Sequence, residues 1–135
     1  MDIVSRVKVL NLPVGKYCVF GSGVLEIHGI RKAKDVDVLV TPDLYLELKK
    51  QGWKRKWIFW RTFFCKAITN GSNEAFTNLH WGAFQPDTTE LIKRAEFFDG
   101  IPFLRLEDLL AFLLYSPRKK DKDGVRRIEE YFASK

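Results

Sequence analysis

The stretch YCVFGSGVLEIHGIRKAKDVDVLV, residues 17–40, decides the fold of this chain. Its last part alternates acidic and β-branched residues, which predicts a strand over residues 35–40 with Asp35 and Asp37 on one face. The two carboxylates are then expected roughly 6 to 7 Å apart, measured between Cα atoms. Ionised carboxylates so placed repel each other and lose hydration unless water or a cation lies between them. A divalent metal resolves this conflict, and Mg²⁺ is commonly held by one or two carboxylates together with substrate phosphates.

A Gly-Ser-Gly corner precedes this strand and follows a short apolar run at residues 17–20. We expect the corner to lead from a buried strand into a short helix over residues 24–28, capped by Ser22 and ended by Gly29. Backbone N–H groups at such a corner can bind phosphate oxygens. Gly21 and Ser22 are therefore candidate phosphate ligands.

Cations stand between the corner and the acid pair, at Arg31, Lys32 and Lys34. A triphosphate needs such cations, so the ordered pattern predicts a nucleoside triphosphate bound together with a metal ion. The alternative interpretation is an ordinary turn followed by an acid pair that faces solvent on a half-exposed sheet.

The rest of the chain predicts helices and a hairpin around this unit. We expect strands at residues 53–68 and 73–81, joined by a turn at residues 69–72. We also expect a helix that begins at Pro42 and is capped at its C-terminus by Gly52, and helices at residues 87–94, 106–115 and 122–133. The apolar stripe expected on the 106–115 helix consists of Leu106, Leu109, Leu110, Leu113 and Leu114. This order predicts an α+β (or α/β) fold in a single domain, residues 1–135, with a mixed sheet flanked by helices and a helical C-terminus.

Composition limits the classes of protein to consider. A chain of 135 residues with 46% hydrophobic content can bury one core, and its formal charge of +6 favours an anionic partner such as nucleotide or nucleic acid. No apolar run approaches the ~20 residues of a membrane helix and no secretory signal stands at the N-terminus, so we expect a cytoplasmic protein without a membrane partner. Cys18 and Cys65 lie among apolar or aromatic neighbours, which predicts buried thiols.

The segments VFGSG, from Val19, and DVDV, from Asp35, resemble the signature of the nucleotidyltransferase superfamily, the polymerase-β-like fold. In that superfamily a Gly-Ser corner holds the triphosphate and two strand aspartates bind the metal ions. The resemblance implies Mg²⁺ or Mn²⁺ at Asp35 and Asp37, which would be the catalytic metal ligands. It also implies phosphate contacts from Gly21 and Ser22.

The segment LEDLLAFLLYSPRKKD, residues 106–121, is similar to the closing helix and R-x-K-D segment of small bacterial and archaeal members. These include the abortive-infection and toxin-antitoxin transferases. Arg118 and Lys120 match the basic positions, which implies that they bind nucleotide together with Arg31 and Lys34. The chain departs from those members at Leu113, where they often carry a lysine.

Active members usually add a third carboxylate on a later strand, and Asn78 stands where we expect it. Alternation places Glu74 and His80 on the same face as Asn78, so either could substitute as a metal ligand. With such a substitute the chain is expected to transfer a nucleotidyl group from an NTP to a hydroxyl of RNA, protein or a small molecule. Without one, it is expected to be a degraded nucleotide- or RNA-binding module, for example within a toxin-antitoxin or defence pair.

Overall fold

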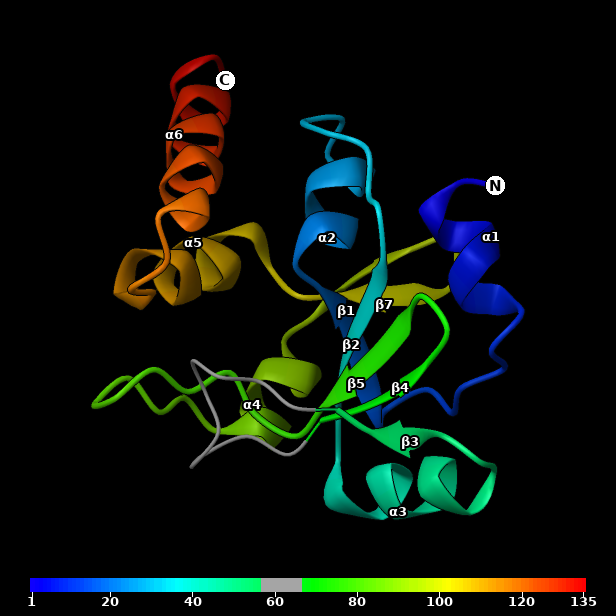
Figure 1. Ribbon diagram of the computed structural model, residues 1–135. Coiled ribbons are helices and arrows are strands. Elements are labelled where there is room, and N and C mark those ends of the chain that lie inside the picture. Colours follow the sequence, from blue (N-terminus) through cyan, green and yellow to red (C-terminus); the bar gives the residue numbers. More distant parts are fainter. Residues whose placement is uncertain (57–66) are drawn as a thin grey trace.

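The computed structural model describes residues 1–56 and 67–135 (Figure 1). Part of the strand expected over residues 53–68, and Cys65 with it, lies outside these ranges. Within the described residues, a seven-stranded mixed sheet is flanked by six helices, and the chain ends in a helix. The expected α+β class and helical C-terminus are confirmed.

The helices are α1 (Ile3–Lys8), α2 (Ser22–Ile27), α3 (Pro42–Lys50), α4 (Thr88–Lys93), α5 (Leu106–Tyr115) and α6 (Lys120–Ala133). The strands are β1 (Tyr17–Phe20), β2 (Val36–Val40), β3 (Lys54–Arg55), β4 (Ala67–Asn70), β5 (Asn73–Phe76), β6 (Glu96–Phe98) and β7 (Ile101–Phe103). In the view of Figure 1, α2 and α6 rise at the top of the molecule and α3 lies at the bottom. None of the described helices combines the length and the apolar content needed to cross a bilayer.

Strands β1 and β2 form the centre of the sheet, whose order is β3-β4-β5-β2-β1-β7-β6. β2 runs antiparallel to β1 and parallel to β5. Cys18, Val36 and Val38 are fully buried, because both faces of these strands are covered. Asp37 of β2, and Asp35 directly before this strand, therefore extend from a buried apolar support.

Local signals set several boundaries as expected. Pro42 occupies the first turn of α3 and Gly52, with φ of +104°, follows its end. Asp87 caps α4 through a bond from the Glu90 backbone N–H, and α5 covers the residues that its leucine period predicts. The hairpin of β4 and β5 turns at Gly71, which has a positive φ of 64°.

Three of the expected local details are wrong. Ser22 does not cap α2, because it is the first helical residue and Gly21 holds the N-cap position without a side-chain bond. The second hairpin strand ends at Phe76 instead of residue 81. Beyond it, the Asn78 side chain accepts from the His80 backbone N–H, a local bond that competes with ladder pairing. The final helix begins at Lys120, two residues earlier than expected.

The apolar face of α5 differs from the expectation. Leu114 is 59% exposed, and Phe112 is buried in the core although it is not part of the expected stripe. On α6, Phe132 is exposed, while Gly124 and Ile128 are buried. The cause is tertiary: α6 crosses α5 at Gly124, where a Cβ atom would lie 3.0 Å from Leu113 Cδ1.

The short elements α1, β6 and β7 were not expected from the sequence. Strand β7 contains Pro102, which argues against a central strand, yet Val19 of β1 pairs with Phe103 in parallel register. A turn at Asp99 and Gly100, both with positive φ, joins β6 to β7. Strands of three residues carry too little periodicity to be recognised in a sequence.

Candidate functional site

A cleft of about 740 Å³ opens where β1, β2 and β5 meet α2 and the start of α6. Its polar lining includes the corner residues Gly21 and Ser22, the carboxylates Asp35, Asp37, Glu74 and Asp121, and the cations Arg31, Lys32, Lys34, Lys56, Arg118 and Lys120. All of the expected nucleotide-binding residues and both aspartates therefore line one cleft. Of the three candidates for a further metal ligand, Glu74 lines the cleft, whereas Asn78 and His80 do not.

Asp37 is the carboxylate that β2 contributes to this lining. In the β-ladders it is opposite Phe20 of β1 on one side and Glu74 of β5 on the other. Its Oδ1 is buried and has no hydrogen-bond partner among the described residues. Burial raises the pKa of Asp37 to about 7, and the negative charges of Glu74 and Asp35 add to the rise. A carboxylate in this position is stabilised by any cation that reaches it.

Gly21 brings the corner directly against Asp37. Its φ of +67° is in the left-handed region, and a Cβ atom there would lie 3.1 Å from Asp37 Oδ2. Only glycine meets both conditions without strain. The backbone of the corner and the carboxylate consequently border the same space, with Ser22 following as the first residue of α2.

Glu74 supplies a carboxylate from the neighbouring strand. Because β2 and β5 are parallel and adjacent strands lie about 4.8 Å apart, its in-register position sets it beside Asp37. Its side chain is 12% exposed and forms an ion pair with Lys56, which follows the edge strand β3. The sequence offered Glu74 as one of three candidates, and the strand register separates it from the other two.

Asn78 and His80 lie beyond the end of β5, where they line a separate depression together with Pro86 and Thr88. The His80 Nε2 atom is 3.3 Å from the carbonyl oxygen of Pro86. The position where the third carboxylate was expected is therefore part of a loop that packs against α4. A carboxylate at residue 78 would not enter the cleft.

Arg118 is held at the cleft by the connection between α5 and α6. Its Nε donates to Asp121 Oδ2 at 2.9 Å, and its guanidinium lies 5.4 Å from the centre of the Trp81 ring. The Ser116 hydroxyl donates to the same Asp121 oxygen at 2.5 Å. The sequence pointed to Arg118 but not to Asp121, whose burial next to a cation is visible only in the structure.

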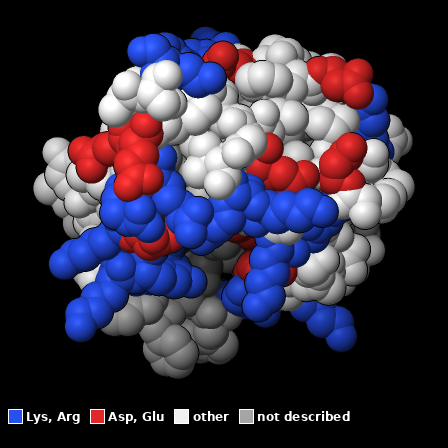
Figure 2. Space-filling model, turned by 90° about the horizontal axis from the view of Figure 1, so that it is seen from above, with Lys and Arg blue, Asp and Glu red and all other residues white. Residues whose placement is uncertain are grey.

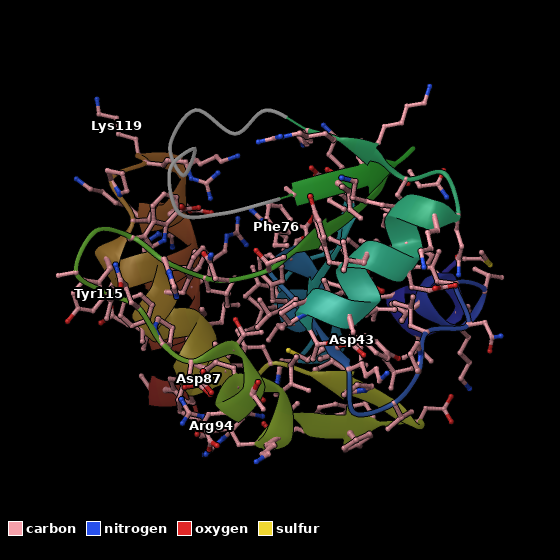
Figure 3. The ribbon with its side chains drawn as sticks, turned by 90° about the horizontal axis from the view of Figure 1, so that it is seen from below. Asp43, Phe76, Asp87, Arg94, Tyr115 and Lys119 are labelled. Atoms are coloured by element: carbon pink, nitrogen blue, oxygen red, sulfur yellow. The ribbon has the colours of Figure 1, made fainter. Side chains whose placement is uncertain are left out.

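The connection between α2 and β2 carries the other cations and is fixed by its backbone. Ala33 N–H donates to the Glu26 carboxylate at 2.8 Å, and Arg6 of α1 donates to the Lys34 carbonyl oxygen at 2.9 Å. Arg31, Lys32 and Lys34 are exposed and form no ion pair within the described residues, like Lys119, Lys120 and Lys122 of the α6 start. Figure 2 shows Lys and Arg gathered across this face around a hollow in which acidic atoms are visible. Figure 3 shows Lys119 at the outer edge of the molecule and Phe76 near its middle.

The cleft lining fits a divalent cation. The orphaned Oδ1 of Asp37 and the repulsion from Asp35 and Glu74 are both relieved by bound positive charge. Asp35 and Asp37 would hold such an ion, with Glu74 as the adjoining carboxylate. No group of three or more acidic, His or Cys side chains is gathered closely enough to form a ready-made metal site in the described part of the chain. Neither a protein-family model nor a curated protein matches the sequence.

Proposed function

We propose that this chain is a nucleotidyltransferase-like protein that binds a nucleoside triphosphate with Mg²⁺ or Mn²⁺ and transfers its nucleotidyl group to a hydroxyl. The observation that carries the proposal is the side-by-side placement of Asp37 and Glu74 next to the Gly21 corner. The cleft thus has three carboxylates from neighbouring positions of the sheet, those of Asp35, Asp37 and Glu74, and its lining also includes six cations. An ordinary acid pair facing solvent would not be half-buried beside a third carboxylate.

One group of cleft residues is suited to bind the phosphates of a nucleotide. Gly21 and Ser22 offer backbone N–H groups and a hydroxyl to phosphate oxygens, and Arg118 and Lys120 add positive charges from the start of α6 to the same cleft. Arg118 is suited to this task, because Asp121 and Trp81 fix its guanidinium before any ligand arrives.

The carboxylate group has a second task besides holding a cation. A bound divalent ion supplies charge neutralisation at the phosphates and lowers the pKa of an acceptor hydroxyl. Glu74 would accept the proton that this hydroxyl loses, a role supported by its position opposite Asp37 and in the lining of the same cleft. Its low exposure keeps it from being fully solvated.

Incubation with each α-labelled NTP and Mg²⁺, alongside candidate RNA and protein acceptors, tests the proposal. Label transfer is expected for the wild type and at least a hundredfold less for Asp35→Asn/Asp37→Asn and for Glu74→Gln. Asn78→Asp serves as a matched control, since it adds a carboxylate outside the cleft and is expected to give no gain. Transfer that persists in all of the cleft variants would overturn the proposal.

The alternative is a binding module that holds nucleotide without transferring it. Two observations favour it: Leu113 stands where related transferases often carry lysine, and Glu74 is engaged by Lys56. Calorimetry distinguishes the two. A module binds Mg²⁺–NTP with an affinity that depends on Asp37, yet releases no pyrophosphate with any acceptor.

A further inference from the structure

Lys56 brings a positive charge to the carboxylates of the cleft. Its ammonium forms an ion pair with Glu74, and both side chains line the cleft. Its charge also lowers the pKa of Asp37, in opposition to burial and to Glu74. In this structure Lys56 is therefore the counter-ion of the acidic end of the cleft.

The backbone of Lys56 is fixed, so its ammonium can change position while the main chain stays in place. Its backbone N–H donates to the Ala67 carbonyl oxygen at 3.0 Å, which ties the main chain to β4. Its side chain is 43% exposed, against 12% for Glu74. The partner that is fixed and desolvated is the carboxylate, and the partner on a long, solvated stem is the cation.

A divalent ion and this ammonium compete for the same oxygen atoms. A carboxylate whose charge is neutralised by an ammonium is a weaker metal ligand. A metal held by Asp35 and Asp37 would in turn repel the ammonium that pairs with Glu74. The displaced ammonium would still be in the cleft, whose lining Lys56 shares with the expected phosphate ligands. An anionic phosphate is the partner that could hold it there.

We propose that Lys56 is a built-in competitor of the divalent cation, which neutralises Glu74 in the empty cleft and is released to the nucleotide phosphates when metal and nucleotide bind together. This inference rests on the proposed function, because it takes Asp35 and Asp37 as the metal ligands. The competition would favour binding of metal and nucleotide together. Metal alone has to displace Lys56 from Glu74, whereas the phosphates of a metal–nucleotide complex offer the displaced ammonium a new partner.

The test measures binding of Mn²⁺ alone, and then of Mn²⁺–ATP, to the full chain by calorimetry. Lys56→Met keeps the length of the side chain and removes its charge. We expect it to bind Mn²⁺ alone roughly three- to tenfold tighter than the wild type and Mn²⁺–ATP more weakly. Arg55→Met is the matched control, because it removes one positive charge from the preceding residue, which does not line the cleft, and should change neither affinity. Lys56→Gln provides a second neutral variant, and melting curves with and without Mn²⁺ verify that each variant is folded.

The outcomes separate this inference from the function on which it rests. Opposite changes in the two affinities for Lys56→Met, with none for Arg55→Met, support the competition. Equal Mn²⁺ affinities for the wild type and Lys56→Met overturn it while leaving the proposed function intact. Absence of Mn²⁺ and Mn²⁺–ATP binding in the wild type and in both Lys56 variants would overturn the proposed function and this inference together.

Discussion

Asp37 has a carboxyl group whose surroundings oppose its charge. It is half-buried, lies beside Glu74 and close to Asp35, and has an oxygen without a partner among the described residues. Strand alternation predicted its orientation, but its neighbours come from β1 and β5, which the acid-apolar pattern of residues 35–40 does not specify. The positive charges of Lys56 and Lys120 partly offset this unfavourable environment.

The pKa of Asp37 predicts how stability depends on pH in metal-free buffer. The folded value of about 7 exceeds the ordinary value of 3.8, so between these limits the folded state binds more protons than the unfolded state. Stability should therefore fall as pH rises from 4 to 7, by at most about 4 kcal/mol. The Asp37→Asn variant should not show this fall in stability. Chemical unfolding of both proteins at pH 5 and pH 8 with EDTA measures the difference, and parallel pH profiles would contradict the expectation.

Gly21→Ala should damage the cleft more than the fold. The new methyl group would meet Asp37 Oδ2 at 3.1 Å and require a left-handed residue, which costs about 1 to 2 kcal/mol. Mg²⁺-dependent ATP binding should weaken at least tenfold, because the corner has to move away from Asp37.

Gly29→Ala is the control for this substitution. Gly29 has a similar φ of +73° at the other end of α2, but a Cβ atom there would have no neighbour within 4 Å. A similar loss of stability with unchanged ATP binding is expected. Equal loss of ATP binding in both variants would mean that backbone strain, and not contact with Asp37, is responsible.

At the scale of elements, the α5–α6 connection joins the helical C-terminus to the cleft. Pro117 separates two helices that cross at Gly124, and Ser116, Arg118 and Asp121 bond to one another across the turn. The leucine period set the bounds of α5, because a helix face repeats every 3.6 residues and needs no information from elsewhere. No side-chain periodicity in the sequence predicts the direction in which the Arg118 side chain points.

Asp121→Ala should destabilise the protein and loosen Arg118. Asp121 is buried, and removing it leaves the Ser116 hydroxyl and the partly buried Arg118 guanidinium without their shared acceptor, at a cost of about 2 to 3 kcal/mol. ATP binding should weaken as well, because Arg118 is no longer fixed in advance. Thermal melting and calorimetry measure the two effects.

Asp123→Ala is the comparison on the same helix. Asp123 pairs with Arg126 and Arg127 on the exposed side of α6, where water screens the charges. Little change in melting temperature and none in ATP binding are expected. If the two variants behaved alike, Asp121 would have no special part in positioning Arg118.

At the scale of the whole molecule, the buried centre of the sheet should respond only to global unfolding. The Cys18 thiol is fully buried in β1, and burial raises its pKa, so thiolate attack on a reagent requires the sheet to open. In a Cys65→Ser variant, we expect an aromatic disulfide reagent to modify Cys18 at the rate of global unfolding. The rate measured with increasing urea should follow the loss of far-ultraviolet circular dichroism. Fast modification in native buffer would show that β1 opens locally.

The sequence by itself determined the local units of this protein: a strand, a glycine corner, a helix and an acidic strand in that order, a hairpin at Gly71, and the α5 helix. Each follows from short-range rules, namely side-chain period, positive φ and capping, which act within a few residues. Only the tertiary structure decided that Glu74, and not Asn78 or His80, lies beside Asp37, because Glu74 pairs with β2 whereas the other two residues lie beyond the end of β5. It likewise decided that Lys56 reaches Glu74 and that Asp121 holds Arg118. These contacts depend on strand order and helix crossing, which arise from burial of the whole apolar surface and leave no periodic trace in the chain.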